Sequence, residues 1–466
     1  AHLLLSTNHQ KVAENGGISD DNYIVHPESY SDNYETSEIP TALSQHWNRN
    51  DNQHVFLTHR YNIGFNRKVP MNEDEIKARK FALASKKENE AQKKKELTGK
   101  EGRKPEEDKP VAQGRPDDAK IMGAEPIAQQ KDSNRTSLDK ATADSLLAVE
   151  QKAKADTAWL KNEFVPVTSF IHTIHFDNYR RIYQAYKTPT DFYANTYIID
   201  EPLTGDSIYD KTRYYSLKNT FAISLLEGFN KWAKSGLKAF IASELRHFTL
   251  PNTTGSTSYN EHNLSIGAQL SKAQGKTFHY NATAETWLTG EDAGQLKFDA
   301  SADLNFKLFG DTLSLTANGF FHRLNPTFYY RHYHSRHAWW DNNSMSKMLH
   351  TRLQGILHYQ KTRTTLRIGI DEINNYAYFA SSYTVNNGNR VNHAITVNQY
   401  GGAINLITIV LSQDFTLGPL NWESVITYQK SNNKTVVPVP DFNIYSNLYI
   451  KFKIARVLSC DFGADV

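Results

Sequence analysis

The feature that most constrains this sequence is the strict alternation of apolar and polar residues over positions 295–308. Seven apolar residues occupy the even positions and seven polar residues occupy the odd positions, without an exception. A period of two is typical of a β-strand, because successive side chains point to opposite faces. At about 3.3 Å per residue, this strand is longer than the roughly 5–6 residues common in soluble sheets. It is long enough to cross a tilted bilayer.

The same period recurs over most of the chain, for example at 264–271 and 442–454. We expect fifteen strands, at approximately 2–11, 53–67, 164–181, 211–228, 235–250, 261–273, 276–290, 294–309, 311–324, 346–360, 362–378, 392–412, 418–431, 442–455 and 457–466. No apolar run approaches the roughly 20 residues of a membrane-spanning helix. The predicted fold class is therefore all-β, a transmembrane antiparallel up-and-down β-barrel.

The connections between these strands alternate between short and long. Short turns follow the even-numbered strands, apart from the second. Long connections follow most odd-numbered strands, at 12–52, 182–210, 251–260, 325–345, 379–391 and 432–441. Outer-membrane barrels have short periplasmic turns and longer extracellular loops, whereas a soluble sandwich has no reason for this asymmetry. The pattern predicts location in the outer membrane of a Gram-negative cell.

One block, residues 72–162, departs from the alternation because it is dense in Lys, Glu, Ala, Gln and Asp. Its ends, 75–97 and 137–160, are rich in helix formers, while its middle is too polar to offset the entropy of ordering. We expect three parts: 1–71 with the first barrel strands and a long extracellular loop, 72–162 as a charged helical and disordered insert, and 163–466 with the other strands. The insert follows an even-numbered strand, which predicts the periplasmic side.

Folding the alternation into a barrel places the polar residues in the lumen, since lipid cannot satisfy charged side chains. The predicted pore-lining residues are Lys238, Glu244, Arg246, Lys297, Asp299, Asp303, Lys307, His350, Arg352, His358, Lys451 and Lys453. They are either solvated wall residues without individual roles or, for some of them, part of a selectivity constriction like the charged rings of pores. The sequence leaves both open.

The connection at 326–343 is unusually dense in aromatic and basic residues. Tyr and Trp could belong to the outer aromatic girdle, or the loop could stack against a sugar or another ligand at the pore entrance. In the second case the ligand-binding residues would be Tyr329, Tyr330, Arg331, Tyr333, Trp339 and Trp340. A metal site from His332, His334 and His337 is less favoured, because the only nearby acid is Asp341 at the far end of the loop. We predict no metal.

Composition and motifs exclude several classes of function. Lys+Arg 53 against Asp+Glu 50 gives a net charge of +3, which disfavours a nucleic-acid binder. One cysteine, Cys460, excludes a disulfide framework and cysteine-based metal clusters. The chain has no nucleophile elbow, zinc-protease motif or phosphate-binding loop. We therefore predict no enzyme, no catalytic residues and no cofactor.

Three stretches, 165–181, 207–223 and 243–251, resemble the putative porin family of Bacteroidota outer membranes. They begin at Val165-Pro166-Val167 and end at His247-Phe248-Thr249-Leu250-Pro251. The resemblance implies an outer-membrane β-barrel with a pore or transport role, and the family offers no catalytic motif to carry over. Such barrels close with an even number of strands and typically end in an aromatic residue. The odd strand count and the Val466 terminus lead us to expect an incomplete barrel, a fragment of a longer chain.

The function predicted first is a porin-like channel that passes small hydrophilic solutes through a polar lumen. Its partners would be outer-membrane lipid and those solutes. The alternatives are a dedicated outer-membrane importer, or a structural platform that holds a periplasmic partner through the 72–162 insert.

Overall fold

The computed structural model describes the chain apart from residues 31–34, 99–159, 200–206, 228–234, 309 and 466. The chain forms two compact units, each considered by itself. The first comprises Ala1–Ile63 with Pro166–Val466, and the second comprises Gly64–Val165. The boundaries predicted at 71 and 162 are close to these limits and stay a prediction.

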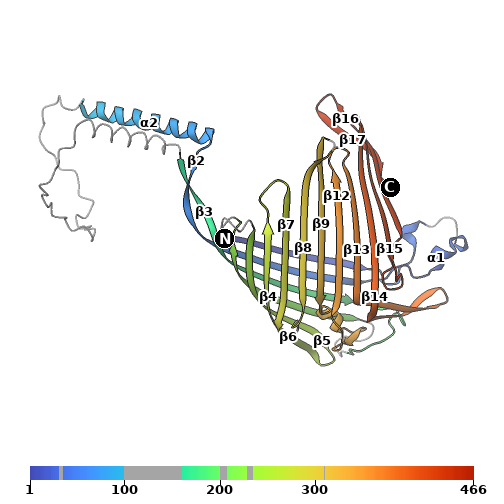
Figure 1. The fold of residues 1–466 in the computed structure, drawn as a ribbon. Helices are drawn as coiled ribbons and strands as arrows, with labels where there is room; N and C mark the ends of the chain where they lie inside the picture. The colour runs from blue at the N-terminus through green and yellow to red at the C-terminus, as the bar shows by residue number, and fades with distance from the viewer. Residues whose placement is uncertain (31–34, 99–159, 200–206, 228–234, 309, 466) are drawn as a thin grey trace, which may run out of the picture. The chain divides into compact units, whose positions relative to one another are not determined.

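The first unit is built on one 15-stranded antiparallel sheet whose strand order follows the chain (Figure 1). Its strands are β1 (His2–Glu14), β2 (His46–Pro70), β3 (Leu160–Ala185), β4 (Ile208–Leu225), β5 (Gly236–Asn252), β6 (Gly255–Lys272), β7 (Phe278–Thr289), β8 (Leu296–Leu308), β9 (Asp311–Leu324), β12 (Met348–Tyr359), β13 (Thr364–Asn386), β14 (Asn389–Leu417), β15 (Leu420–Ser431), β16 (Phe442–Ile454) and β17 (Leu458–Asp465). The predicted up-and-down order and the fifteen strands are confirmed. Within the described residues, β1 and β17 are the sheet edges and do not pair with each other.

The two faces of the sheet differ as the alternation predicts. Across β8 and β9, Phe298 lies opposite Phe321 and Leu304 opposite Leu315, so that apolar residues of neighbouring strands share one face. These side chains are exposed; Phe298, for example, is 42% exposed. A soluble protein would bury such a face, whereas lipid solvates it.

The buried core lies on the opposite face, where a loop packs against the strands. Phe248 and Leu250 of β5 pack with Phe328, which belongs to the long connection between β9 and β12. The rings of Phe248 and Phe328 stack with their centroids 3.6 Å apart. The core is therefore small and fixes a loop on the polar side of the sheet.

Two of the predicted long connections are wrong. The predicted loops at 251–260 and 379–391 are two-residue turns, because β5, β6, β13 and β14 continue through them. Asn387 and Gly388 both have positive φ, of 49° and 82°. This conformation is that of a type I′ hairpin turn, for which Asn-Gly is the preferred sequence.

Two of the other long connections contain short elements. The β1–β2 connection holds α1 (Asn22–Val25), η1 (Pro27–Ser29) and η2 (Thr36–Glu38). The β9–β12 connection holds α4 (Phe328–Arg331) and a small hairpin of β10 (His332–His334) and β11 (Trp339–Asp341). This hairpin pairs His332 with Asp341.

The second unit contains the long helix α2 (Glu73–Thr98). Asn72 and Glu75 form a reciprocal capping box at its start, with hydrogen bonds of 2.8 and 3.0 Å. Lys161 Nζ lies 2.5 Å from Glu75 Oε1. The helix predicted at 75–97 is confirmed, and the middle of the insert and its predicted second helix lie outside the described residues. In the described part of the chain, no helix combines the length and apolar character needed to span a membrane.

Candidate lumen wall and ligand cavity

The predicted pore-lining residues of β8 lie on its polar face, and the two carboxylates among them, Asp299 and Asp303, contact histidines of neighbouring strands. His322 Nε2 lies 2.9 Å from Asp299 Oδ1, and His279 Nδ1 lies 2.6 Å from Asp303 Oδ2. Lys297 Nζ is 4.0 Å from Asp299. The strand alternation places these groups in a row, and imidazoles hold the carboxylates in position.

The structure brings β8 and β12 together through β9, so that predicted residues from two parts of the sequence meet. Lys297 lies opposite His322, and His322 lies opposite His350. His350 Nε2 is 2.8 Å from Asp371 Oδ1, and Arg352 Nε is 3.8 Å from the same oxygen. Asp299 and Arg352 line one depression of about 400 Å³. His358 hydrogen-bonds Thr365 instead, at 2.9 Å.

Glu244 and Arg246 belong to a buried charge network that joins the wall to the loop. Arg246 donates two hydrogen bonds of 2.9 Å to Glu244 and lies 2.8 Å from Asp292 and 3.3 Å from Glu261. Arg331 of the β9–β12 connection reaches Glu261 at 2.6 Å. Glu261 therefore links the wall to the loop.

The remaining predicted pore-lining residues are four lysines: Lys238, Lys307, Lys451 and Lys453. Among the described side chains, none of their amines has a carboxylate within 4 Å. Lys238 lies over the Phe240 ring at 5.9 Å and Lys451 over the Tyr449 ring at 5.0 Å. Lys307, Lys451 and Lys453 are exposed and Lys238 is half-buried, in contrast to the paired charges of Asp299, Asp303 and Arg352.

A cavity of about 690 Å³ lies where the loops fold over the polar face. Its wall combines the inward residues of β1, β3 and β4 with β13, β14 and the β9–β12 connection. The aromatic lining residues are Tyr179, Tyr183, Tyr193, Tyr329, Tyr333, Trp340 and Phe379, and the main polar ones are Glu14, Arg181, Asp210, His337 and His393.

Contacts between distant segments close this cavity. Arg181 donates from Nη1 to the Tyr333 hydroxyl at 2.8 Å and from Nε to Asn48 Oδ1 at 3.0 Å. The β3–β4 connection reaches β14, since the His393 amide donates to the Phe192 carbonyl at 2.7 Å. The Tyr193 and Tyr183 hydroxyls lie 3.1 Å apart. Both sides of the curved sheet thus contribute to one site.

The six predicted ligand-binding residues divide into two groups. Tyr329, Tyr333 and Trp340 line the cavity. The other three are absent from its lining: the Tyr330 ring stacks on Phe379 at 4.6 Å, the Trp339 ring stacks on His334 at 3.7 Å, and Arg331 is buried in its ion pairs. The ligand role of all six stays a prediction.

The sequence reasoning missed the strand residues that complete the cavity, above all Tyr179, Arg181 and Tyr183 of β3 and Asp210 of β4. A signal was present, because Tyr179, Arg181 and Tyr183 stand two residues apart and therefore share one face. This spacing alone could not predict a binding site, because the sequence does not show that the β9–β12 connection folds onto that face.

Two groups of His and Asp side chains come together in the structure. His332 Nδ1 and His334 Nε2 lie 2.8 and 3.0 Å from Asp341, while His337 is apart from them and stacks on Tyr193. Burial alone would raise the pKa of Asp341, but the hydrogen bonds from His332 and His334 hold it below its ordinary value.

The second group lies on the polar face of β2 and β3. His54, His175 and Asp177 have ligand atoms that all lie within 4.8 Å of one another. Ser216 donates to the other oxygen of Asp177 at 3.4 Å. Two imidazoles and a carboxylate are a donor set for first-row divalent metals.

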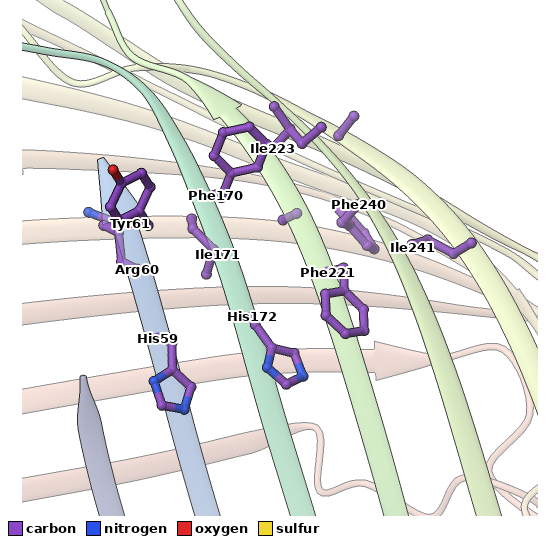
Figure 2. A pocket seen from close by; sticks show the side chains of 12 residues that line it. His59, Arg60, Tyr61, Phe170, Ile171, His172, Phe221, Ile223, Phe240 and Ile241 are labelled. Atoms are coloured by element: carbon purple, nitrogen blue, oxygen red, sulfur yellow. The ribbon is translucent and has the colours of Figure 1, made fainter. Parts of the chain in front are cut away.

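An apolar groove of about 610 Å³ lies on the opposite face of the sheet, across β2 to β5 (Figure 2). Phe170, Phe221, Ile223 and Ile241 line it, and each is more than two-fifths exposed. His172 stacks on Phe221 there, with ring centroids 4.2 Å apart. The groove belongs to the exposed apolar face of the sheet.

Comparisons with solved structures give low similarity. A variant of the ferric enterobactin receptor from Pseudomonas aeruginosa aligns over 98% of this chain and 62% of its own, at 9% identity and a TM-score of 0.48. The siderophore receptor PirA from the same organism aligns over 62% of this chain and 58% of its own, at 10% identity and a TM-score of 0.36. The chain thus spans about three-fifths of the length of these receptors.

No curated protein sequence matches this chain. The family described as "Putative porin", in contrast, matches residues 1–466, which is the whole of it. This match agrees with the antiparallel sheet, the exposed apolar face and the polar opposite face. The chain belongs to the putative porin family.

Proposed function

We propose that this protein is a porin-like channel that passes small hydrophilic solutes along the polar face of its sheet. The observation that carries the proposal is the row of charged groups on β8, β9, β12 and β13, directly opposite an exposed apolar face. Lipid cannot solvate Asp299, Arg352 or Asp371, so that face lines water in a membrane. Solutes would pass along the twelve predicted wall residues, and the chain would have no catalytic role.

In this proposal the end of the barrel with short turns faces the periplasm. The 72–162 insert joins β2 to β3 and would therefore extend into the periplasm, while the β3–β4 and β9–β12 connections would face outward. This orientation rests on the usual asymmetry of outer-membrane barrels.

A second candidate is a dedicated importer, which one observation favours. The cavity between Arg181 and Trp340 is covered by connections from both sides of the sheet, and a nonselective pore has no need of such a cover. The two candidates differ in whether ions pass freely or whether passage depends on a bound solute.

Conductance of the purified protein in planar bilayers tests the proposal. Discrete steps are expected, and a salt gradient should give a reversal potential set by the wall charges. Asp299→Lys adds positive charge to the wall and should shift that potential toward anion selectivity. Phe298→Leu, one residue away on the apolar face, is the matched control and should leave it unchanged. Folded protein that does not conduct would contradict the proposed channel. Equal shifts of the reversal potential in Asp299→Lys and Phe298→Leu would also contradict it.

A further inference from the structure

We infer that the loop-covered cavity binds a neutral saccharide of one or two rings. The inference rests on the proposed function and names the class of solute that this channel recognises. The cavity volume of about 690 Å³ falls in the range of roughly 300–1,000 Å³ in which proteins bind small molecules.

The shape of the lining suits a sugar ring, which has apolar C–H faces and a rim of hydroxyls. Tyr333 and Trp340 stack with centroids 4.9 Å apart and line the cavity with Tyr179, Tyr183 and Tyr329. Aromatic side chains of this kind present an apolar surface together with a polar edge. A flat apolar ligand would leave the buried Tyr329 hydroxyl and His393 Nε2 without partners.

Several polar groups of the lining have unused hydrogen-bonding capacity. The Tyr329 hydroxyl and His393 Nε2 are buried and have no hydrogen-bond partner among the described residues. Arg181 makes two hydrogen bonds to neutral oxygens, and no described carboxylate lies within 4 Å of it. Buried polar groups in native proteins are normally satisfied, so these groups point to a ligand that both donates and accepts.

The mixed charge of the lining favours a neutral ligand over a strongly charged one. Arg181 contributes +1, while Glu14 and Asp210 contribute −2, which leaves a formal charge of −1. Burial lowers the pKa of His337, so that imidazole adds no positive charge at neutral pH. A polyanion would meet a net negative site, and a cation would meet Arg181. A neutral polyol can form hydrogen bonds with Arg181, Glu14 and Asp210 without burying a further charge.

Calorimetric titration of the detergent-purified protein with sucrose and maltose tests the inference. Glucuronate and choline serve as charged comparison ligands. We expect saturable binding of a neutral disaccharide with a Kd of about 1 mM or tighter. Tyr329→Phe removes only an unpartnered hydroxyl and keeps the ring, so the variant should fold and bind severalfold more weakly.

A matched pair of arginine variants locates the site. Arg181→Met should weaken binding about tenfold or more, because a buried hydrogen bond from a charged group is lost. Arg180→Met should leave the affinity unchanged, because Arg180 points to the opposite face and donates to Asp51 at 2.7 Å. An equal loss of saccharide affinity in the two variants would show that the saccharide does not bind in this cavity.

Absence of saturable saccharide binding, or tighter binding of glucuronate or choline, would overturn the ligand class. Conductance separates this result from failure of the channel itself. A conducting protein that binds no saccharide contradicts only the inference, and a saccharide-binding protein that never conducts contradicts only the proposed channel.

Discussion

At the scale of single residues, histidines are the hydrogen-bonding neighbours of several wall carboxylates, where lysine or arginine would be the commoner choice. His54, His175 and Asp177 go further, because their ligand atoms converge within 4.8 Å. The ring of Phe56 packs edge-on against His175, which fixes its orientation. A first-row divalent cation held there would retain open positions for water.

Calorimetric titration with Zn²⁺ and Ni²⁺ checks this group. The protein should bind one ion at this site, and His175→Ala should lower its affinity at least tenfold, since one of three protein ligands is lost. His172→Ala is the control, because its ring lies on the apolar face against Phe221. Equal affinities in the two variants would show that the ion binds elsewhere.

We expect His337 to make the stability of the loop depend on pH. Burial lowers its pKa, while its hydrogen bond to the Asn195 carbonyl, 2.8 Å long, opposes the shift. Because the unfolded chain then binds more protons, stability is full above the ordinary value of 6.5 and falls as the pH drops toward the lowered pKa. Asp341, whose ordinary value is 3.8, stays ionised throughout this window.

We expect the melting temperature to fall between pH 7.5 and 5.5, and to fall less in His337→Gln, which can still donate to the Asn195 carbonyl. Thermal unfolding in detergent at the two pH values measures this. The same loss of melting temperature in both proteins would assign the pH dependence to other groups.

Single residues also show which contacts could be predicted from the sequence and which could not. Alternation was enough to expect Asp299 and Arg352 on one face. It could not reveal that Asp371 joins them, because that contact depends on the register between β12 and β13. Arg331 was predicted to bind a ligand, and only its burial shows that Glu261 and Glu291 occupy it.

At the scale of elements, the turn between β13 and β14 contacts the β1–β2 connection, far away in the sequence. Gly388 has φ of 82°, and a Cβ at this position would lie 2.6 Å from Asp20 Oδ1 in the β1–β2 connection. The Asp21 amide donates to the Gly388 carbonyl at 3.2 Å. The turn therefore attaches one end of the sheet to a distant connection.

Gly388→Ala should destabilise the protein by about 1–3 kcal/mol, because it adds backbone strain and a clash with Asp20. Gly418→Ala is the matched control, since Gly418 also has positive φ but nothing within 4 Å of its Cβ position. Urea denaturation of both variants measures the difference. A loss in Gly418→Ala as large as that in Gly388→Ala would show that the contact with Asp20 contributes nothing.

Elements with a strong period were predictable, and short ones were not. The Asn387-Gly388 pair is itself a hairpin signal, and treating the surrounding polar residues as a loop caused the error at 379–391. The strands β10 and β11 are three residues each, which is too short for any period to appear. They also contact aromatic residues from distant segments, Trp339 with Tyr197 and His332 with Tyr259.

At the scale of the whole molecule, the sheet and the charged insert are separable in sequence. A protein lacking residues 72–162 should conduct with steps of the same size if the sheet alone forms the channel. Single-channel recording compares it with the full chain. Loss of conductance in a folded deletion protein, together with loss of a co-purifying periplasmic partner, would favour the platform function.

The arrangement of the loops over the sheet could not be predicted from the sequence. Tyr193 forms a bridge with His393, two segments 200 residues apart (393 − 193), and nothing in either segment identifies the other. Their meeting follows from the curvature of the sheet, which arises from the twist of all its strands together. The cavity is thus a property of the whole unit.

The bridge between Tyr193 and His393 also has a consequence for the order of folding. Each hairpin of the sheet joins neighbours in the chain, so its contacts form at low cost in loop-closure entropy. The contacts that cover the cavity close a loop of 200 residues and can form only after the intervening strands are paired. The hairpins should therefore form first, and the loop-covered cavity should be completed in the last step of folding.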